Sequence, residues 1–247
     1  MEAYLNWSGG KDASFALWQL QKQGNIQVRG LFTTLSAAYR RVSMHGVQER
    51  LLDEQALRTG IPLKKAYLPE NASMEDYNGI MTEALESYRQ AGITRAVFGD
   101  IFLEDLRAYR ESQLAKAGME GIFPLWKRDS LELAKDFIAS GFRAVIVCAN
   151  DRYLPASFAG REFDAAFLED LPGNVDPCGE NGEFHSFVYD GPIFHAPVPF
   201  QMGETVTRTY APARNNDDCY KKEDPEKDDA PTAWDTRFHF RELHPAG

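Results

Sequence analysis

The feature that most constrains the fold is a glycine-rich turn near the start of the chain, between a short apolar segment and an amphipathic one. Residues 3–7 form an apolar run that predicts a buried strand. Residues 15–20 carry apolar side chains three and four positions apart, which predicts a helix. Residues 8–12 lie between them and read Ser-Gly-Gly-Lys-Asp. The chain therefore turns from a strand directly into a helix through a Gly-Gly pair.

This position suits a phosphate group. Glycines let backbone N–H groups approach an anion, and the start of a helix adds free donors and a partial positive charge. Lys11 can meet the phosphate charge, Ser8 can donate its hydroxyl, and Asp12 can orient Lys11 or hold a metal. The same residues are also compatible with an ordinary turn whose Lys-Asp pair caps the helix. The spacing is not that of a Walker loop.

Predicted strands and helices alternate from residue 3 to residue 148. The strands are expected at 3–7, 28–33, 63–68, 96–98, 121–126 and 144–148, and the helices at 15–20, 48–59, 73–92, 106–117 and 129–140. The strands are continuous apolar runs, which is typical of a parallel sheet with helices on both faces. Residues 1–150 are therefore predicted to form an α/β domain. Ligands of such sheets bind at the carboxyl ends of the strands, where the opening loop, Thr33 and the Gly99–Asp100 pair would converge.

Residues 151–247 do not continue the alternation of strands and helices, and they predict a smaller, strand- and loop-rich domain. The elements expected there are a helix at 163–168, a strand at 184–189, a hairpin turn at 190–192 into Ile193-Phe194, a strand at 206–210 and an edge strand at 237–241. Residues 215–229 are charged and almost free of apolar side chains, which predicts a mobile loop.

Composition limits the classes of function. The chain has 247 residues and a formal net charge of −10, which disfavours sequence-independent binding to nucleic acid. Its three cysteines, Cys148, Cys178 and Cys219, are far apart, which argues against a disulfide framework and favours a cytoplasmic protein. No apolar run approaches the roughly 20 residues that span a membrane, so no membrane partner is expected. The sequence leaves homo-oligomerisation open.

Residues 176–186 form a polar loop that leads into a strand and contain several side chains capable of catalysis or metal binding. It holds Asp176, Cys178, Glu180, Glu183 and His185. The carboxylates and the imidazole can hold Mg²⁺ together with substrate phosphates, and His185 can act as a general acid or base. Cys178 can act as a nucleophile, but the sequence places no base beside it. Alternatively, the loop is solvated and its carboxylates cap backbone donors.

Both loops resemble signatures of one family, the diphthine–ammonia ligases, which are a branch of the pyrophosphatase-loop ATPases. Residues 8–12 resemble the loop Ser-Gly-Gly-Lys-Asp-Ser, with Ala13 in place of the last serine. Residues 179–186, Gly-Glu-Asn-Gly-Glu-Phe-His-Ser, resemble the second signature. Gly99-Asp100-Ile101 with Arg110-Glu111, and Pro124-Leu125-Trp126, resemble internal motifs of the family. The motifs occur in the family's order, and the lead-in at 176–178 resembles the bacterial branch.

The resemblance implies an adenine nucleotide alpha hydrolase-like fold with an ATP-binding domain at 1–150 and a substrate-side domain at 151–247. It also implies a ligase that activates a small-molecule or protein-borne carboxylate as an acyl-adenylate, releases pyrophosphate, and transfers ammonia to the acyl group. The implied cofactors are ATP and Mg²⁺. The ATP-binding residues would be Ser8, Gly9, Gly10, Lys11, Asp12, Ser14, Thr33, His45, Gly99 and Asp100.

The remaining implied roles fall largely on the second loop. Lys11, Glu183 and His185 would be catalytic, and Asp12 would hold Mg²⁺. Substrate would contact Glu180, Asn181, Glu183 and Ser186.

Two other functions compete with this prediction. One is a tRNA-modifying enzyme with a pyrophosphatase loop, against which the net acidity and the lack of a Cys-x-x-Cys motif count. The other is a nucleotide-binding sensor without catalysis, which Ala13 favours because a phosphate donor is missing there.

Overall fold

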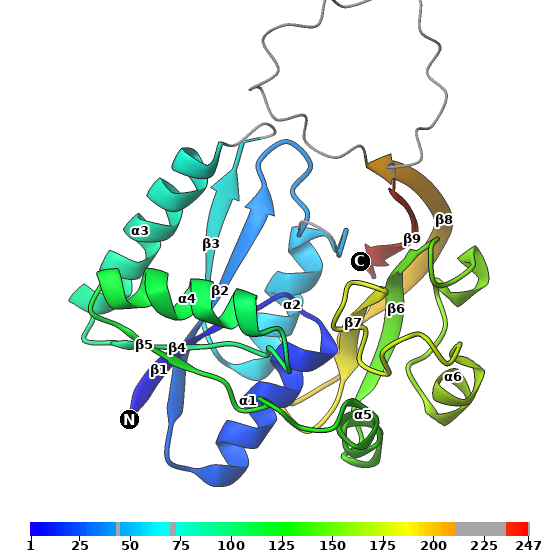
Figure 1. The fold of residues 1–247 in the computed structure, drawn as a ribbon, viewed down its shortest axis with the longest axis horizontal. Helices are drawn as coiled ribbons and strands as arrows, with labels where there is room; N and C mark the ends of the chain where they lie inside the picture. Colours follow the sequence, from blue (N-terminus) through cyan, green and yellow to red (C-terminus); the bar gives the residue numbers. More distant parts are fainter. Residues whose placement is uncertain (43–44, 70–72, 211–235, 247) are drawn as a thin grey trace, which may run out of the picture.

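The fold consists of two β-sheets, one parallel and one antiparallel, with helices packed around them (Figure 1). The computed structural model describes residues 1–42, 45–69, 73–210 and 236–246. The parallel sheet has the strand order β3-β2-β1-β4-β5, and the antiparallel sheet has the order β7-β6-β9-β8. The predicted α/β class, with a strand-rich C-terminal part, is therefore confirmed.

The first half of the chain builds the parallel sheet in the order that the sequence predicts. Its strands are β1 (Glu2–Asn6), β2 (Gln27–Ser36), β3 (Leu63–Leu68), β4 (Arg95–Val97) and β5 (Glu120–Ile122). The connecting helices are α1 (Lys11–Gln23), α2 (Glu49–Thr59), α3 (Met74–Gln90) and α4 (Glu104–Lys116). All pairings within this sheet are parallel.

Helices cover both faces of this sheet because successive strand side chains point to opposite faces. Leu5 and Leu31 belong to a core that also contains buried side chains of α1 and α2. Tyr4 and Phe32 belong to a second core, with buried side chains of α3 and α4. Tyr4 stacks there on Tyr88 of α3, with ring centroids 4.2 Å apart.

The antiparallel sheet consists of β6 (Arg143–Asn150), β7 (Phe184–Asp190), β8 (Phe200–Tyr210) and β9 (Thr236–Pro245). Helices α5 (Ser130–Ala139) and α6 (Ala165–Asp170) and a 3₁₀ turn (Ala156–Phe158) accompany it. Buried side chains of this sheet join the same core as α1 and α2. The two sheets are therefore held together by one continuous apolar core.

The structure corrects the place of the apolar strand at 144–148. That segment is β6, which pairs antiparallel with β7 and β9 and does not extend the parallel sheet. A run of apolar residues shows that a strand is buried, and it carries no information about the direction of its neighbours.

Two further expectations in the C-terminal part are wrong. Ile193 and Phe194 do not form a strand after the turn at 190–192, and the nearby Pro192, Pro197 and Pro199 lack the N–H groups that a ladder needs. The segment at 237–241 belongs to β9, which lies between β6 and β8 rather than at an edge. Alternating side chains report the two faces of a strand, and not whether its edges are paired.

One sequence expectation, the mobile loop at 215–229, falls on residues that the structure does not describe. Among the helices of the described part of the chain, none is both long enough and apolar enough to cross a membrane.

Gln55 of α2 fastens the two sheets to each other. Its side chain is fully buried and donates from Nε2 to the carbonyl oxygens of Gly9, at 2.9 Å, and Val188, at 2.6 Å. Its Oε1 accepts from the indole N–H of Trp7 at 2.9 Å. Gln55 therefore binds the loop after β1 and strand β7 at the same time.

Replacing Gln55 with Ala should lower the free energy of unfolding by about 3 kcal/mol or more, because buried polar groups of Trp7 and Val188 lose their partner. Gln21→Ala, at an exposed position of α1, is the matched control and should change it by less than about 0.5 kcal/mol. Urea unfolding of the two variants measures the difference. Equal urea midpoints for the two variants would show that Gln55 does not stabilise the contact between the loop after β1 and strand β7.

Candidate functional site

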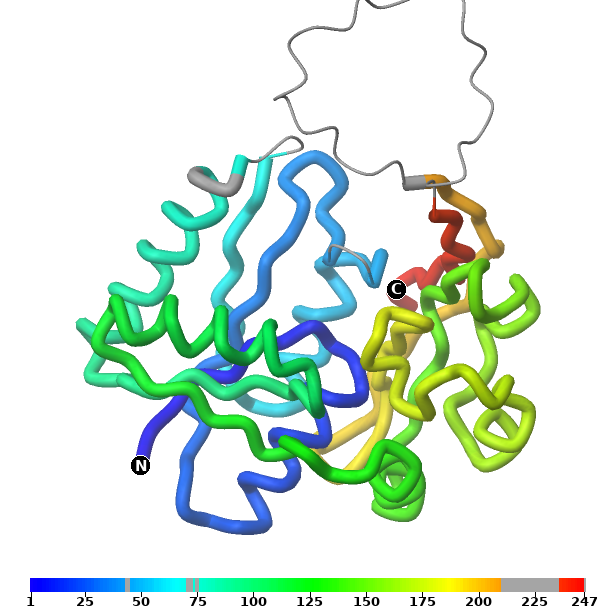
Figure 2. The backbone as a smooth tube through the Cα atoms, viewed as in Figure 1, coloured from blue at the N-terminus to red at the C-terminus, as the bar shows by residue number. Residues whose placement is uncertain are grey.

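A cleft of about 410 Å³ lies at the carboxyl ends of β1, β2 and β4. The chain after β1 passes there beside the segment that leads into β7 (Figure 2). The sequence-predicted residues that line it come from five regions: Ser8, Gly10, Lys11, Asp12, Thr33, His45, Gly99, Asp100, Glu180, His185 and Ser186. Both loops singled out in the sequence therefore face one cavity.

The start of α1 forms the floor of the cleft. Gly10 is its N-cap residue and supplies no side-chain capping bond. The Lys11 amide donates to Ser186 Oγ, which leaves the next amides of the helix, those of Asp12 and Ala13, for a ligand. Gly9 has a φ of +77°, and a Cβ there would lie 2.7 Å from Gln55 Oε1. Glycine is needed at this position for both reasons.

Lys11 brings a buried positive charge to the floor of the cleft. The residue is only 4% exposed, and its Nζ donates to both Oδ atoms of Asp12 at 2.8 Å. The rings of Phe163 and Phe184 lie 5.8 and 5.6 Å from Nζ, within cation–π range. Burial alone would lower the pKa of Lys11, but the Asp12 carboxylate together with Cys178 and Glu180 outweighs it, and the pKa is raised. Lys11 is therefore charged at neutral pH.

Strand β7 forms the wall opposite the parallel sheet. Its outer edge is capped by the opening loop, since Val188 N donates to Gly9 O at 2.9 Å. Two residues earlier, Ser186 Oγ accepts from Lys11 N at 3.1 Å. Ser186 thus contacts α1 through its hydroxyl, and the preceding residue, His185, lines the cavity.

The end of β4 comes close to the start of α1. A Cβ on Gly99 would lie 2.8 Å from the backbone carbon of Asp12, so only glycine permits this approach. The next residue, Asp100, pairs with Arg110 of α4 at 2.7 Å between Oδ2 and Nε. The Arg110 guanidinium also lies over the Phe98 ring, 4.5 Å from its centroid.

Glu180 brings a second carboxyl group to this end of the cleft. Its Oε1 accepts from Ile101 N at 2.7 Å, which ties the 179–186 loop to the end of β4. Burial, and then the nearby negative charge of Asp12, raises the pKa of Glu180 to about 7. This carboxyl group can therefore gain or lose a proton near neutral pH.

His45 and His185 stack on each other beside Gly10. Their ring centroids are 4.4 Å apart, and a Cβ on Gly10 would lie 3.1 Å from His45 Cε1. Burial and the Lys11 charge lower the pKa of His45 to about 4. Burial also lowers the pKa of His185 well below its ordinary value, with His45 and Lys11 adding to the effect. Both imidazoles are neutral at pH 7 and can serve as hydrogen-bond donors or acceptors.

Some predicted site residues do not line the cleft. Gly9 faces Gln55, and Ser14 is completely buried within α1. Glu183 accepts three hydrogen bonds inside its own loop: from Asp176 N at 3.1 Å, Asn181 N at 2.9 Å and Asn181 Nδ2 at 3.0 Å. Asn181 and Glu183 therefore shape the loop from within.

Cys178 is also absent from the cleft lining. It is buried, and burial raises the pKa of its thiol to about 12. The Sγ–H donates to the Ser130 carbonyl oxygen at 3.2 Å. A neutral thiol held in this way is not an activated nucleophile.

The sequence reasoning missed residues on helices α2, α3 and α4. Gln55 is a polar residue in the apolar stripe of α2, next to the buried Leu51, Leu52 and Ala56, and that interruption was the available signal. Arg110, Tyr77 and Met81 line the cleft from α4 and α3. Arg110 is recognisable in the sequence only as part of a family motif, without a role in the site. Nothing in the helical pattern distinguishes Tyr77 or Met81 from ordinary helix residues.

Within the described part of the chain, no group of three or more His, Cys, Asp or Glu side chains could hold a metal ion by itself. Asp12 does line the cleft. Mg²⁺ in nucleotide sites is commonly held by one or two carboxylates together with substrate phosphates. The residues present therefore fit Mg²⁺ only as a partner of a bound nucleotide.

Comparison with known proteins gives matches along most of the chain. The diphthamide synthase N-terminal domain matches residues 1–121, and the diphthamide synthase C-terminal domain matches residues 129–209. The chain is 26% identical to a diphthine–ammonia ligase of Danio rerio, over 81% of this chain and 86% of that protein. It is 24% identical to that of Bos taurus, over 82% and 84%, and 23% identical to that of Mus musculus, over 81% and 82%.

Glu180 should make the folded protein less stable as the pH rises from about 4.5 to about 7. In this range the unfolded chain loses the carboxyl proton while the folded protein, with its raised pKa, retains it. Glu180→Gln removes this contribution, so its free energy of unfolding should not show the same decline. Urea unfolding of the wild type and Glu180→Gln between pH 4 and 8 measures how the free energy of unfolding depends on pH.

The difference between the two curves is the quantity to compare. His45 and His185 act in the opposite direction, since their lowered pKa values add stability as the pH rises. Their contribution is common to both proteins and cancels. Parallel curves would mean that the Glu180 carboxyl titrates normally.

Proposed function

The chain belongs to the diphthamide synthase family, and we propose that it activates a carboxylate with ATP and converts it into an amide with ammonia. It is an ATP-dependent carbon–nitrogen ligase of that family. The relatives are named for diphthine. For this chain we propose the wider class of carboxylates, small-molecule or protein-borne.

The observation that carries the proposal is the buried, charged Lys11 at the start of α1, which lines the cleft. Its only acidic partner within hydrogen-bond distance among the described residues is the adjacent Asp12. Triphosphate oxygens can replace that partner, because they offer more negative charge and can also accept from the first amides of the helix. Ser8 and the neutral His45 and His185 line the same space and add donors.

The first step that we propose is transfer of the adenylyl group. A carboxylate oxygen of the substrate forms a bond to the α-phosphorus of ATP, and the bond from that phosphorus to the bridging oxygen breaks. Pyrophosphate leaves with the electron pair, and an acyl-adenylate remains. Lys11 and the helix amides stabilise the charge that develops on the phosphates.

The second step is attack by ammonia on the acyl carbon. The carbon–oxygen bond to AMP breaks, AMP leaves, and the nitrogen loses one proton as the amide forms. We propose Glu180 as the group that accepts this proton, because its carboxyl lines the cleft and titrates near neutral pH. This role replaces the catalytic role first expected for Glu183, which is engaged within its own loop.

Mg²⁺ supplies charge neutralisation for the phosphates when it is bound. We propose that Asp12 would hold it together with the nucleotide. The pairing of Asp12 with Lys11 is compatible with this role, since phosphate oxygens would compete for the Lys11 ammonium group and leave the carboxylate available.

We propose that the chain divides into an ATP-binding part and a substrate-side part. The change from the parallel to the antiparallel sheet occurs between β5 and β6. The two matched segments end and begin at residues 121 and 129. Both observations favour a division near residues 122–128, earlier than residue 150.

Replacing Lys11 with Met should reduce the formation of AMP and pyrophosphate by about 100-fold or more, which is the effect of removing one preorganised charge donor. Lys22→Met, at an exposed position of the same helix, should leave the rate unchanged. Both products are quantified by chromatography after incubation with ATP, Mg²⁺, ammonium chloride and a panel of carboxylic acids. Formation of ADP and phosphate by the wild-type protein would contradict the proposal.

A fold control is needed because Lys11→Met leaves the Asp12 carboxylate without its partner. The double variant Lys11→Met/Asp12→Asn removes both charges and should unfold at a urea concentration close to that of the wild type. Its loss of AMP formation then reports the chemistry and not the fold.

A further inference from the structure

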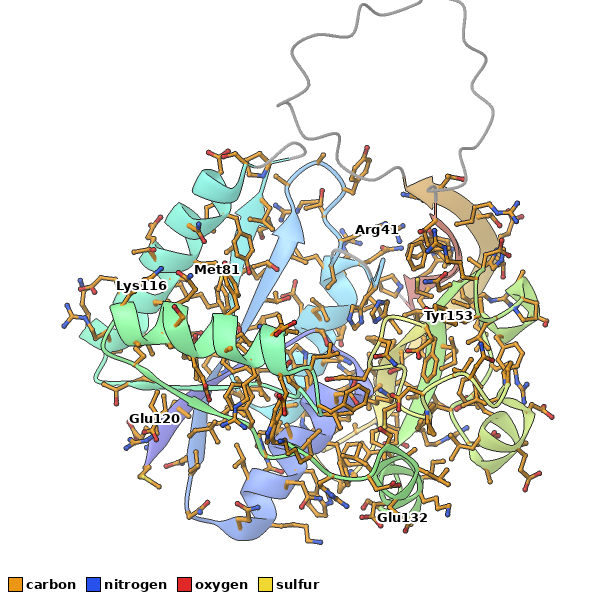
Figure 3. The ribbon with its side chains drawn as sticks, viewed as in Figure 1. Arg41, Met81, Lys116, Glu120, Glu132 and Tyr153 are labelled. Atoms are coloured by element: carbon orange, nitrogen blue, oxygen red, sulfur yellow. The ribbon has the colours of Figure 1, made fainter. Side chains whose placement is uncertain are left out.

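A second cavity of about 230 Å³ lies between α3 and α4, beside the cleft. We call it the side pocket. Tyr77, Met81, Phe98 and Arg110 line both cavities, so the two are adjacent. Figure 3 labels Met81 on α3 and Lys116 on α4, the two helices that form the walls of the side pocket.

The inner walls of the side pocket are apolar. Tyr4, Leu85 and Leu114 line its base and are each less than a tenth exposed. Polar side chains gather at the outer rim, where the hydroxyl of Tyr109 on α4 donates to Asn78 Oδ1 on α3 at 3.4 Å. This bond spans the gap between the two helices. An apolar base with a bridged polar rim suits the end of a small ligand.

Arg110 stands at the junction of the two cavities. Its guanidinium is held from two directions, by Asp100 at 2.7 Å and by the Phe98 ring at 4.5 Å. It therefore forms a fixed, flat wall between the charged floor of the cleft and the apolar side pocket. A ligand that spans this junction would present a polar end to the cleft and an apolar end to the side pocket.

The cleft also extends in the other direction, along β2. Thr33, Thr34 and Val42 line it there. Strands β2 and β4 lie on opposite sides of β1. The cleft therefore extends from the start of α1 in two directions, toward β2 and toward β4. A nucleotide whose phosphates lie at α1 can extend along β2, which leaves the space toward β4 and the side pocket for the second substrate.

We propose that the side pocket receives the apolar group of the carboxylate substrate, a single ring or a short aliphatic chain, while its carboxylate lies in the cleft beside α1. The inference rests on the proposed amide-forming function and adds a substrate class to it. The size agrees, since a cavity of about 150 Å³ holds one benzene molecule. Acids without an apolar group would leave the side pocket empty and bind more weakly.

Thr82→Phe tests the inference because Thr82 lines the side pocket and not the cleft. It is an exposed residue of α3, so a larger side chain can be accommodated without disturbing the core. Glu83→Phe, the next and also exposed residue, adds the same ring outside the side pocket and is the matched control. Gln113→Trp fills the side pocket from α4 and serves as an independent second variant.

The probes are phenylacetate, hexanoate and acetate, and calorimetry measures their binding without turnover. We expect phenylacetate and hexanoate to bind the wild type and Glu83→Phe more tightly than acetate does. Thr82→Phe and Gln113→Trp should weaken both by at least about tenfold, the effect of losing one or two buried methylene equivalents. The affinity for ATP should stay within about twofold in all variants.

Three results would overturn the inference. They are equal binding of the three acids to the wild type, unchanged phenylacetate binding in both filled variants, and a loss of ATP affinity in those variants. The last result would place the nucleoside in the side pocket. Formation of AMP is measured separately. Specific binding of phenylacetate at the side pocket by a protein that forms ADP and phosphate instead of AMP would refute the proposed function and leave the site itself supported.

Discussion

The hydrogen bonds to the Gly9 carbonyl oxygen are the contacts on which the rest of the site depends. This oxygen accepts from Val188 N of β7 and from Gln55 Nε2 of α2. The left-handed backbone of Gly9 is what turns the carbonyl toward them. These two hydrogen bonds hold strand β7, almost 180 positions later in the chain, as the wall opposite the phosphate-binding turn. Ser186 and His185 reach the cleft only because β7 is fixed there.

Charge in the cleft is arranged so that few groups are ionised without a partner. Lys11 is charged and paired with Asp12, whereas His45 and His185 are held neutral by burial and by that same charge. Glu180 titrates near pH 7 because burial and neighbouring carboxylates disfavour its ionised form. An anionic ligand at α1 would change this balance directly, since it would add negative charge beside Lys11 and the imidazoles.

Local patterns in the sequence predicted the parallel sheet, its helices and most of the cleft. Strand ends bring Thr33, Gly99 and Asp100 together for topological reasons, so their convergence follows from the order of elements. The pairing of β6 and the inner place of β9 could not be predicted, because apolar runs and alternation do not specify neighbouring strands. The hydrogen bonds that Glu183 accepts within its own loop could not be predicted either. In the sequence, a carboxylate that accepts backbone hydrogen bonds looks the same as one that faces a ligand. Gln55 left only the signal of an amide within an apolar stripe.

The central claim is that the start of α1 binds the α- and β-phosphates of ATP. A crystal structure with the non-cleavable α,β-methylene analogue of ATP tests it most directly. We expect both phosphates within hydrogen-bond distance of Lys11 and the first amides of α1, with the nucleoside along β2 and the side pocket free. A triphosphate bound elsewhere, or a nucleoside between α3 and α4, would contradict it.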